Sequence, residues 1–226
     1  MKILSWNLER PKNISNSDKN IIITDLIQIL NPDILFLTET NSAIEFKNYF
    51  VHQSVELPKL HDNQEYKVGE NRISIFSKFQ IEEVIETYDA YTAICCIVNS
   101  PIGKLTLYGS IIGSFGGKDK YFKKDLEFQK YEIARLAKSQ NLIYSGDFNI
   151  SFSGFAYPSK SVILEMSDFF TSNSLVNITN GNENSAIQVV TSSEILKDKK
   201  LSQEMVEIDR KISDHNLIIV EMIDTH

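Results

Sequence analysis

The chain has 226 residues, of which 42% are hydrophobic and 23% are charged, and its formal net charge is −7 at pH 7. This balance predicts an ordinary soluble globular protein, with residues 1–226 forming one domain around one substantial core. The excess of acidic side chains argues against a broad, sequence-independent grip on polyanions, because such a grip requires many Lys and Arg side chains.

Cysteine usage and the N-terminus predict a cytoplasmic protein with no membrane partner. Cys95 and Cys96 are neighbours in an apolar strand, so they point to opposite faces and are expected to be reduced core residues with no structural disulfide. Residues 1–7 lack the apolar segment of a signal peptide, and no apolar run approaches the roughly 20 residues of a membrane span.

The first third of the chain predicts a strand, a helix, a second strand and a loop. The first strand ends at Asn7, and Ser17 can cap a helix whose apolar residues follow helical spacing, namely Ile22, Ile23, Leu26, Ile27 and Leu30. The strand over 33–37 is apolar on both faces, as in a buried sheet. Residues 54–71 are polar and show no period, which indicates a mobile surface loop. His52 and His61 are either substrate contacts or, more typically, solvated side chains.

The rest of the chain alternates strands with single helices. Strands are predicted over 72–77, 81–86, 91–98 and 104–112, as an antiparallel meander. Helices are predicted over 119–139 and 159–170, and shorter strands over 142–144, 175–178, 187–191, 205–208 and 217–220. Strand runs separated by helices, in two halves, predict an α/β fold: a four-layer sandwich of two mixed β-sheets flanked by helices.

A glycine, an acid and an amide follow the apolar run at 142–144. Gly146 lets the backbone turn, and alternation then places Asp147 and Asn149 on one face and Phe148 on the other. Polar groups just beyond the carboxyl end of a buried strand are where sheet proteins commonly place ligands, so this is a candidate phosphate or metal site. Taken alone, a Gly-Asp pair at a strand end is more typical of a turn.

Three further strand ends carry matching polar groups. Asp214 and His215 lie between two predicted strands near the C-terminus, Asn7 ends the first strand, and Glu39 ends the second. Phosphate ester hydrolysis needs such side chains, because a catalyst must neutralise charge, supply hydroxide and stabilise the leaving oxygen.

Four short motifs occur in order along the chain: WN at 6–7, TET at 38–40, GDFN at 146–149 and SDHN at 213–216. Their order and spacing resemble the endonuclease/exonuclease/phosphatase superfamily of metal-dependent phosphoesterases, which includes pancreatic-type deoxyribonucleases and abasic-site endonucleases. The resemblance implies a Mg²⁺-dependent phosphodiesterase, first of all a nuclease with nucleic acid as substrate. A phosphatase or phosphodiesterase acting on small or lipid substrates is the alternative.

The resemblance also implies a metal site. Glu39 suits Mg²⁺, or Mn²⁺ in its place, because these ions take oxygen ligands and keep several waters for substrate to displace. Asn7 and Asp214 are its implied partners around that ion. Without the other motifs, Glu39 would be read as an exposed acid at a strand end.

The remaining motif residues are implied to form the catalytic group. Asp147 resembles the aspartate that positions or deprotonates the attacking water, and Asn149 resembles the amide that donates to the phosphoryl oxygens. His215, with Asp214 beside it, can bind the scissile phosphate or transfer a proton, because its unperturbed pKa of about 6.5 lies close to working pH.

A series of lysines gives a candidate basic patch for the substrate. Lys118 follows the glycine-rich turn at 113–117 and precedes Lys120, Lys123 and Lys124. The alternative, which the pattern favours, is a solvated helix face.

Two positions depart from the family pattern. Where the family commonly places a His or Tyr, the chain reads Ile112-Gly113-Ser114, and Tyr108 earlier in that strand is expected to pack in the core. Where a penultimate strand usually carries an Asp that orients the histidine, the chain offers Gln188, so we expect Gln188→Asp to raise the rate. These losses keep a second class of function open, a catalytically weakened member that binds a phosphorylated ligand or partner.

Overall fold

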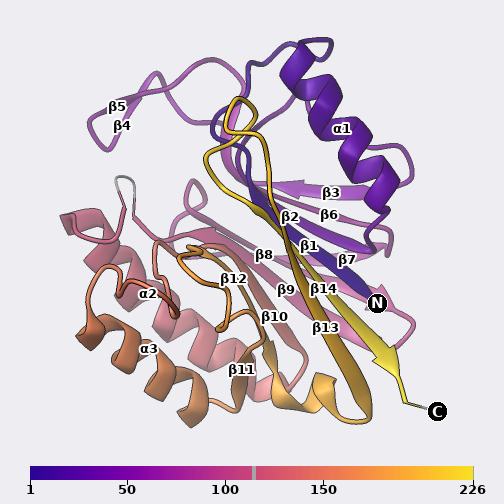
Figure 1. Cartoon of the computed structure of the whole chain (residues 1–226), viewed down its shortest axis with the longest axis vertical. Helices are drawn as coiled ribbons and strands as arrows, with labels where there is room; N and C mark the ends of the chain where they lie inside the picture. The colour runs from indigo at the N-terminus through magenta and orange to yellow at the C-terminus, as the bar shows by residue number, and fades with distance from the viewer. Residues whose placement is uncertain (114–115, 226) are drawn as a thin grey trace.

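The computed structural model describes residues 1–113 and 116–225 and places two six-stranded sheets face to face (Figure 1). The first sheet has the order β13-β14-β1-β2-β6-β3, and the second has the order β11-β12-β10-β9-β8-β7. β1 (Lys2–Asn7) runs parallel to β2 (Ile34–Asn41), and β9 (Gly103–Ile111) runs parallel to β10 (Leu142–Asp147). All other pairs are antiparallel, so both sheets are mixed.

The remaining strands complete the two sheets and add a small hairpin. The first sheet also contains β3 (Phe50–Gln53), β6 (Glu70–Ser77), β13 (Lys199–Val206) and β14 (Leu217–Asp224). The second also contains β7 (Ile81–Ile85), β8 (Ala93–Ser100), β11 (Leu175–Asn177) and β12 (Ile187–Ser192). β4 (Leu60–His61) and β5 (Gln64–Glu65) pair only with each other.

Helices cover the outer faces of both sheets. α1 (Asp18–Leu30) lies on the first sheet, and α2 (Lys120–Leu136) and α3 (Lys160–Ser172) lie on the second (Figure 1). Ser17, Asp119 and Ser159 cap them, because each side chain accepts a hydrogen bond from a first-turn backbone N–H. Short 3-10 turns follow at Ala137–Ser139 and Ser193–Leu196. In the part of the chain described, no helix is long and apolar enough to cross a membrane.

Three apolar layers hold these elements together. Phe36 and Leu107 belong to the layer between the two sheets. Trp6 and Ile27 belong to the layer under α1, and Phe122 belongs to the layer under α2 and α3. Three apolar layers between elements mean four layers of secondary structure: α1, the first sheet, the second sheet, and α2 with α3. The predicted four-layer α/β sandwich is therefore confirmed.

Several predicted boundaries differ from the structure. β6 joins the first sheet, so only β7, β8 and β9 form an antiparallel meander. The predicted loop contains the β4–β5 hairpin, and β3 precedes it; both are too short and too exposed to show a hydrophobic period. β13 begins at Lys199, well before 205, because an exposed edge strand needs no apolar run. Ile22 is exposed and lies off the buried face of α1.

Candidate active site

The end of β1 connects the two sheets through one amide. Asn7 is buried, and its Nδ2 donates to Asp147 Oδ2 of β10 at 2.8 Å and to Glu39 Oε1 of β2 at 3.2 Å. Its Oδ1 accepts from the backbone N of Glu9 at 2.8 Å, which fixes the orientation of the amide. Three of the predicted residues therefore meet where the carboxyl ends of β1, β2 and β10 come together.

The end of β10 brings an acid and an amide to the same place. Asp147 Oδ1 accepts from the backbone N of Asn149 at 3.0 Å, and Asn149 Nδ2 donates to Ile112 O at 3.0 Å. Asn149 has a second amide hydrogen for a ligand, since an NH₂ group carries two. Gly146 is required just before them, because a Cβ there would lie 1.9 Å from Ser110 O.

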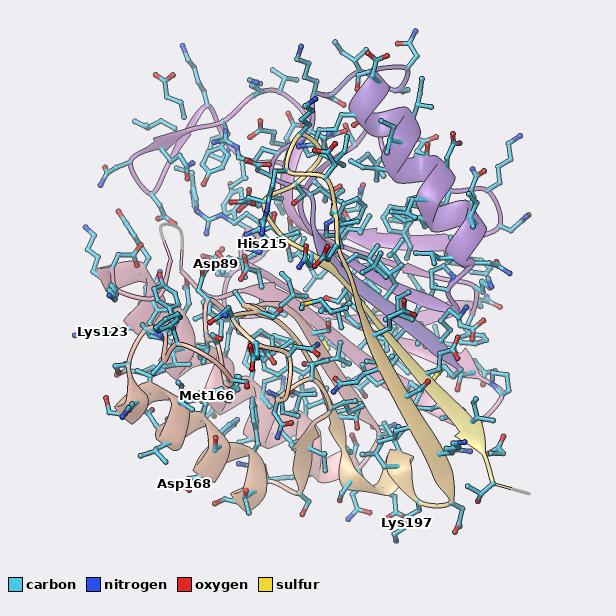
Figure 2. The ribbon with its side chains drawn as sticks, viewed as in Figure 1. Asp89, Lys123, Met166, Asp168, Lys197 and His215 are labelled. Atoms are coloured by element: carbon cyan, nitrogen blue, oxygen red, sulfur yellow. The ribbon has the colours of Figure 1, made fainter. Side chains whose placement is uncertain are left out.

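The loop between β13 and β14 carries His215 to the end of β10. His215 Nε2 lies 3.9 Å from Asp147 Oδ2 and 3.4 Å from Asp214 Oδ1. Ser213 Oγ donates to a β1 carbonyl at 2.7 Å, and Trp6 Nε1 donates to His215 O at 3.1 Å. The serine of SDHN and the tryptophan of WN thus position the histidine, which Figure 2 shows where the loops of the two sheets meet.

Glu39 lies among other carboxylates. Burial raises the pKa of Glu39 above its ordinary value, and the hydrogen bond from Asn7 opposes that rise. The carboxylates of Asp147 and Asp214 raise the pKa further, because negative charges repel one another. A cation beside Glu39 would relieve this repulsion, and a carboxylate oxygen is a ligand that Mg²⁺ prefers.

Asp214 is a second carboxylate near Glu39 and the end of β1. Over residues 1–113 and 116–225, no group of three or more His, Cys, Asp and Glu side chains is arranged to hold a metal ion. Mg²⁺ usually needs only one or two carboxylates, with waters completing its shell, so Glu39 and Asp214 suit it. The Asp214 side chain is 61% exposed, and its backbone N donates to Glu9 Oε2 at 3.2 Å. Sequence reasoning missed Glu9, although the acid directly after the WN motif was the available signal.

A cavity of about 240 Å³ opens beside these residues; we call it the site cavity. Four predicted residues line it: Glu39, Asp147, Asn149 and His215. Its other walls were not predicted and include Arg10, Thr40, Tyr66, Glu70, Asn71 and Arg72. Most of these come from the stretch before β6 and from β6 itself, where the sequence has no catalytic motif.

The predicted lysine patch lies elsewhere. Lys118 and Lys123 line a separate depression between α2 and α3. Figure 2 shows Lys123 on the outer side of α2, far from His215. Neither His52 nor His61 lines the site cavity. Lys118 therefore does not line the site cavity, although Gly116 lines it and Gly117, directly before Lys118, packs against the backbone carbonyl of Asn149.

Four of the twelve non-glycine residues with positive φ in the described part of the chain lie at or next to the site cavity. Glu9, Arg10, Glu39 and Asn149 have φ values of 51°, 49°, 49° and 51°. Such left-handed backbone is uncommon for residues other than glycine and costs about 1–3 kcal/mol each. Hydrogen bonds hold this left-handed backbone in place. For example, Arg10 N donates to Glu39 O at 3.1 Å. Strain gathered at neighbouring residues is typical of functional sites.

Gln188 does not lie behind His215 as expected. It is fully buried, and its Nε2 donates to the backbone carbonyls of two residues at 3.1 and 2.8 Å. Its Oε1 accepts from Asn177 Nδ2 at 3.1 Å and from Thr179 Oγ1 at 2.9 Å. Every hydrogen-bonding site of this amide is used to hold the turns around β12, so the expected gain from Gln188→Asp has no basis in the structure.

The second departure from the family pattern stands. Ile112 is buried and offers only its carbonyl, and Ser114 lies outside the described residues. Tyr108 packs in the core as predicted, and its hydroxyl donates to Glu132.

The chain belongs to the Endonuclease/Exonuclease/phosphatase family, whose sequence model matches residues 4–166. The family unites nucleases and phosphatases, so the chain is an enzyme of the phosphoesterase class. No curated protein sequence matches it.

Solved structures share the fold over nearly the whole chain. The endonuclease domain of TRAS1, a telomere-specific non-LTR retrotransposon, is 14% identical, with a TM-score of 0.71 and coverage of 100% of this chain and 99% of that one. The 3′ phosphatase NExo from Neisseria, bound to a product DNA hairpin, is 13% identical, with a TM-score of 0.66 and coverage of 99% of both chains. A beta toxin mutant from Staphylococcus aureus, with bound magnesium ions, is 15% identical, with a TM-score of 0.63 and coverage of 97% and 98%. These likenesses confirm the fold.

Gln188→Asp is expected to destabilise the protein by about 2 kcal/mol or more, because it removes two donors from buried carbonyls and buries a charge. Chemical denaturation measures the loss, and Gln203→Asp on the exposed strand β13 is the matched control. A variant of unchanged stability and higher hydrolysis rate would restore the orienting role of position 188.

Proposed function

We propose that this protein is a Mg²⁺-dependent phosphodiesterase, a nuclease acting on nucleic acid or nucleotide phosphodiesters. The observation that carries the proposal is the convergence of Glu39, Asp147, Asn149 and His215 in one cavity at the joined ends of two sheets. Family membership supports it, and so do structural neighbours described as an endonuclease domain, a DNA-bound phosphatase and a magnesium-bound toxin.

Asp147 is the group that we assign to the attacking water. Asn7 and the backbone of Asn149 donate to its two oxygens, so the carboxylate has one fixed orientation. A carboxylate held in this way can align a water molecule and accept its proton as the oxygen attacks phosphorus. His215 Nε2, 3.9 Å away, stabilises the negative charge when protonated.

Asn149 and His215 are assigned to the phosphoryl group. The second amide hydrogen of Asn149 can donate to a phosphoryl oxygen without adding charge that would repel the nucleophile. His215 can donate from Nε2 to the phosphate or to the leaving oxygen, which would otherwise depart as a poor alkoxide.

Glu39 and Asp214 are the residues that would hold Mg²⁺, with Glu9 beside them. Asn7 contributes mainly by holding Glu39, because its own Oδ1 already accepts from a backbone N–H. When bound, the ion would neutralise charge on the phosphoryl and leaving oxygens.

The size of the site cavity and the charge of the protein favour binding of a short part of the substrate. The site cavity of about 240 Å³ and the net charge of −7 suit contacts with few nucleotides, since binding to a long stretch of nucleic acid requires a long basic groove.

We also propose that residues 1–226 act as one domain in the cytoplasm. The free, buried Cys95 and Cys96 support a reducing compartment.

One observation favours a second candidate function. Ile112 supplies no polar side chain where the family resemblance places one, which would suit a protein that binds a phosphorylated ligand without hydrolysing it.

Glu39→Gln is expected to weaken Mn²⁺ binding by about tenfold or more, because it removes a charged oxygen ligand from a hard-cation site. Calorimetry with Mn²⁺ measures the effect. Glu127→Gln, which removes the same charge from the exposed face of α2, is the matched control and should bind as the wild type does. Equal affinity in both variants would remove Glu39 from the metal site.

Asp147→Asn is expected to lower turnover by about a hundredfold or more, because the amide cannot accept the proton of the attacking water. The measurement is hydrolysis of oligonucleotides and of bis(4-nitrophenyl) phosphate with Mg²⁺. Asp168→Asn on α3, which Figure 2 shows far from His215, is the control. If the wild type binds oligonucleotide yet hydrolyses neither substrate, the binding-only function stands and the nuclease does not.

A further inference from the structure

One peptide group connects the helix α2 to Asn149 of the proposed site. It is the peptide group between Ile112 and Gly113, and Gly113 lines the site cavity. Its carbonyl accepts from Asn149 Nδ2 at 3.0 Å, and its N–H donates to Asp125 Oδ2 on α2, also at 3.0 Å. The carboxylate, the peptide group and the amide thus form one chain of hydrogen bonds. The bonds of such a chain strengthen one another, because each polarises the next group.

The peptide group before it makes the same kind of connection. Its carbonyl, that of Ile111, accepts from Gln129 Nε2 at 3.0 Å, and its N–H donates to Asp147 O at 2.9 Å. Gln129 lies four residues after Asp125, so both side chains leave the same face of α2. Tyr88 joins them, because its hydroxyl donates to Asp125 Oδ1 at 3.0 Å and accepts from Gln129 Nε2 at 3.1 Å. The inner face of α2 therefore fixes the backbone just behind the end of β10.

Asp125 is a buried acid that packing alone does not explain. It is 4% exposed, and it forms no ion pair with any residue that the structure describes. Burying a carboxylate without a cationic partner is costly, so an apolar side chain would serve the fold better at this position. Burial raises the pKa of Asp125 to about 6, and the nearby charges of Arg72 and Lys124 oppose that rise. At neutral pH the group is therefore ionised, which is the form that accepts on both of its oxygens.

The orientation of the Asn149 amide decides what it can do for a phosphate. With Nδ2 toward the carbonyl of Ile112, the second amide hydrogen is a donor for a phosphoryl oxygen. Turned over, the amide would present its oxygen to the phosphate, and two acceptors repel one another. A carbonyl polarised by Asp125 accepts more strongly and therefore favours the first orientation.

We propose that Asp125 is a positioning residue that orients the amide of Asn149 through the peptide group between Ile112 and Gly113. The proposal rests on the function proposed above, in which Asn149 donates to the phosphoryl group. Ile112 supplies no polar side chain to the site, but its peptide group supplies a polarised carbonyl that holds Asn149.

A double-mutant cycle tests whether Asp125 acts through Asn149. Asp125→Asn keeps the shape of the side chain and removes its charge. It is expected to lower kcat/KM for bis(4-nitrophenyl) phosphate by about tenfold, which is part of the cost of losing one donor to the reacting group. In the background of Asn149→Ala the same change is expected to have little further effect, because the amide that Asp125 orients is absent. Equal losses in both backgrounds would overturn the proposal.

Glu132→Gln is the matched control on the same helix. Glu132 is also a buried carboxylate, and it accepts from Tyr88 N at 2.7 Å and from the Tyr108 hydroxyl at 2.5 Å. Neither bond reaches the peptide group of Gly113, so the variant disturbs the same packing without reaching the site. Chemical denaturation compares the stability of the two variants. A loss of kcat/KM in Glu132→Gln as large as that in Asp125→Asn would show that these acids support only the fold, and the proposal would fail.

Nuclear magnetic resonance follows the chain of hydrogen bonds without relying on turnover. In the wild type, the backbone N–H of Gly113 and the side-chain amide of Asn149 are expected to shift with one common midpoint at about pH 6, as Asp125 gains a proton. Asp125→Asn should remove both shifts, and Glu132→Gln should keep them. Any part of the Asn149 shift that remains in Asp125→Asn belongs to His215, which that variant retains.

The groups around Asp125 leave this titration easy to assign. The ionisable side chains that interact with it are Tyr88, Arg72 on β6, Lys124 on α2 and Tyr144 on β10. None of them is a carboxyl or an imidazole, the groups that ordinarily titrate on the acid side of neutrality. A shift of Gly113 at about pH 6 therefore reports the proton on Asp125.

The spectra separate failure of the positioning role from failure of the proposed function. If the wild type hydrolyses no diester but Asn149 follows the titration of Asp125, the positioning role stands and the phosphodiesterase falls. If hydrolysis occurs and Asn149 depends on Asp125 neither in the spectra nor in the cycle, the phosphodiesterase stands and the positioning role falls. The wild-type titration needs no variant, so it decides the matter even if Asp125→Asn does not fold. A wild type in which Gly113 titrates and Asn149 does not share its midpoint would overturn the proposal.

Discussion

The arrangement of the site depends on a single amide that faces two carboxylates. Asn7 donates both to Glu39 of its own sheet and to Asp147 of the opposite sheet. These hydrogen bonds stabilise both carboxylates and partly offset the repulsion between them, which raises the pKa of Glu39. Ser5 and Ser145 make a second polar contact between β1 and β10, at 2.9 Å, two residues deeper in the sandwich. The two sheets are thus held in register where the chemistry is placed.

The apolar layers of the fold offset the energetic cost of the strained backbone around the site cavity. Apolar contacts between the sheets and under the helices provide the stabilisation that offsets four left-handed backbone residues around the site cavity. Gly146 permits the close approach of β9 and β10 just before Asp147. Rigid strands therefore end in strained turns, which direct Asp147, Asn149 and Glu39 into the same cavity.

The motif residues and most of the other cavity walls come from different parts of the chain. The acids, amide and imidazole come from the ends of long buried strands, where their positions are fixed by the ladder. Many of the other walls come from residues 57–72, which include the hairpin of the two-residue strands β4 and β5 and the start of β6. Tyr66 and Arg72 there are paired with their neighbours, so this wall is preorganised.

The sequence alone determined the three helices, the cap at Ser17, the strand ends at Asn7 and Asp147, the family and the four-layer fold, because each follows from local periodicity or a short motif. Only the tertiary structure decided that β6 joins the first sheet, that Gln188 faces a turn and not His215, and that Lys118 lies outside the site cavity. These outcomes depend on which strands pair and where side chains point across the sandwich, and such long-range choices leave no period or motif in the chain.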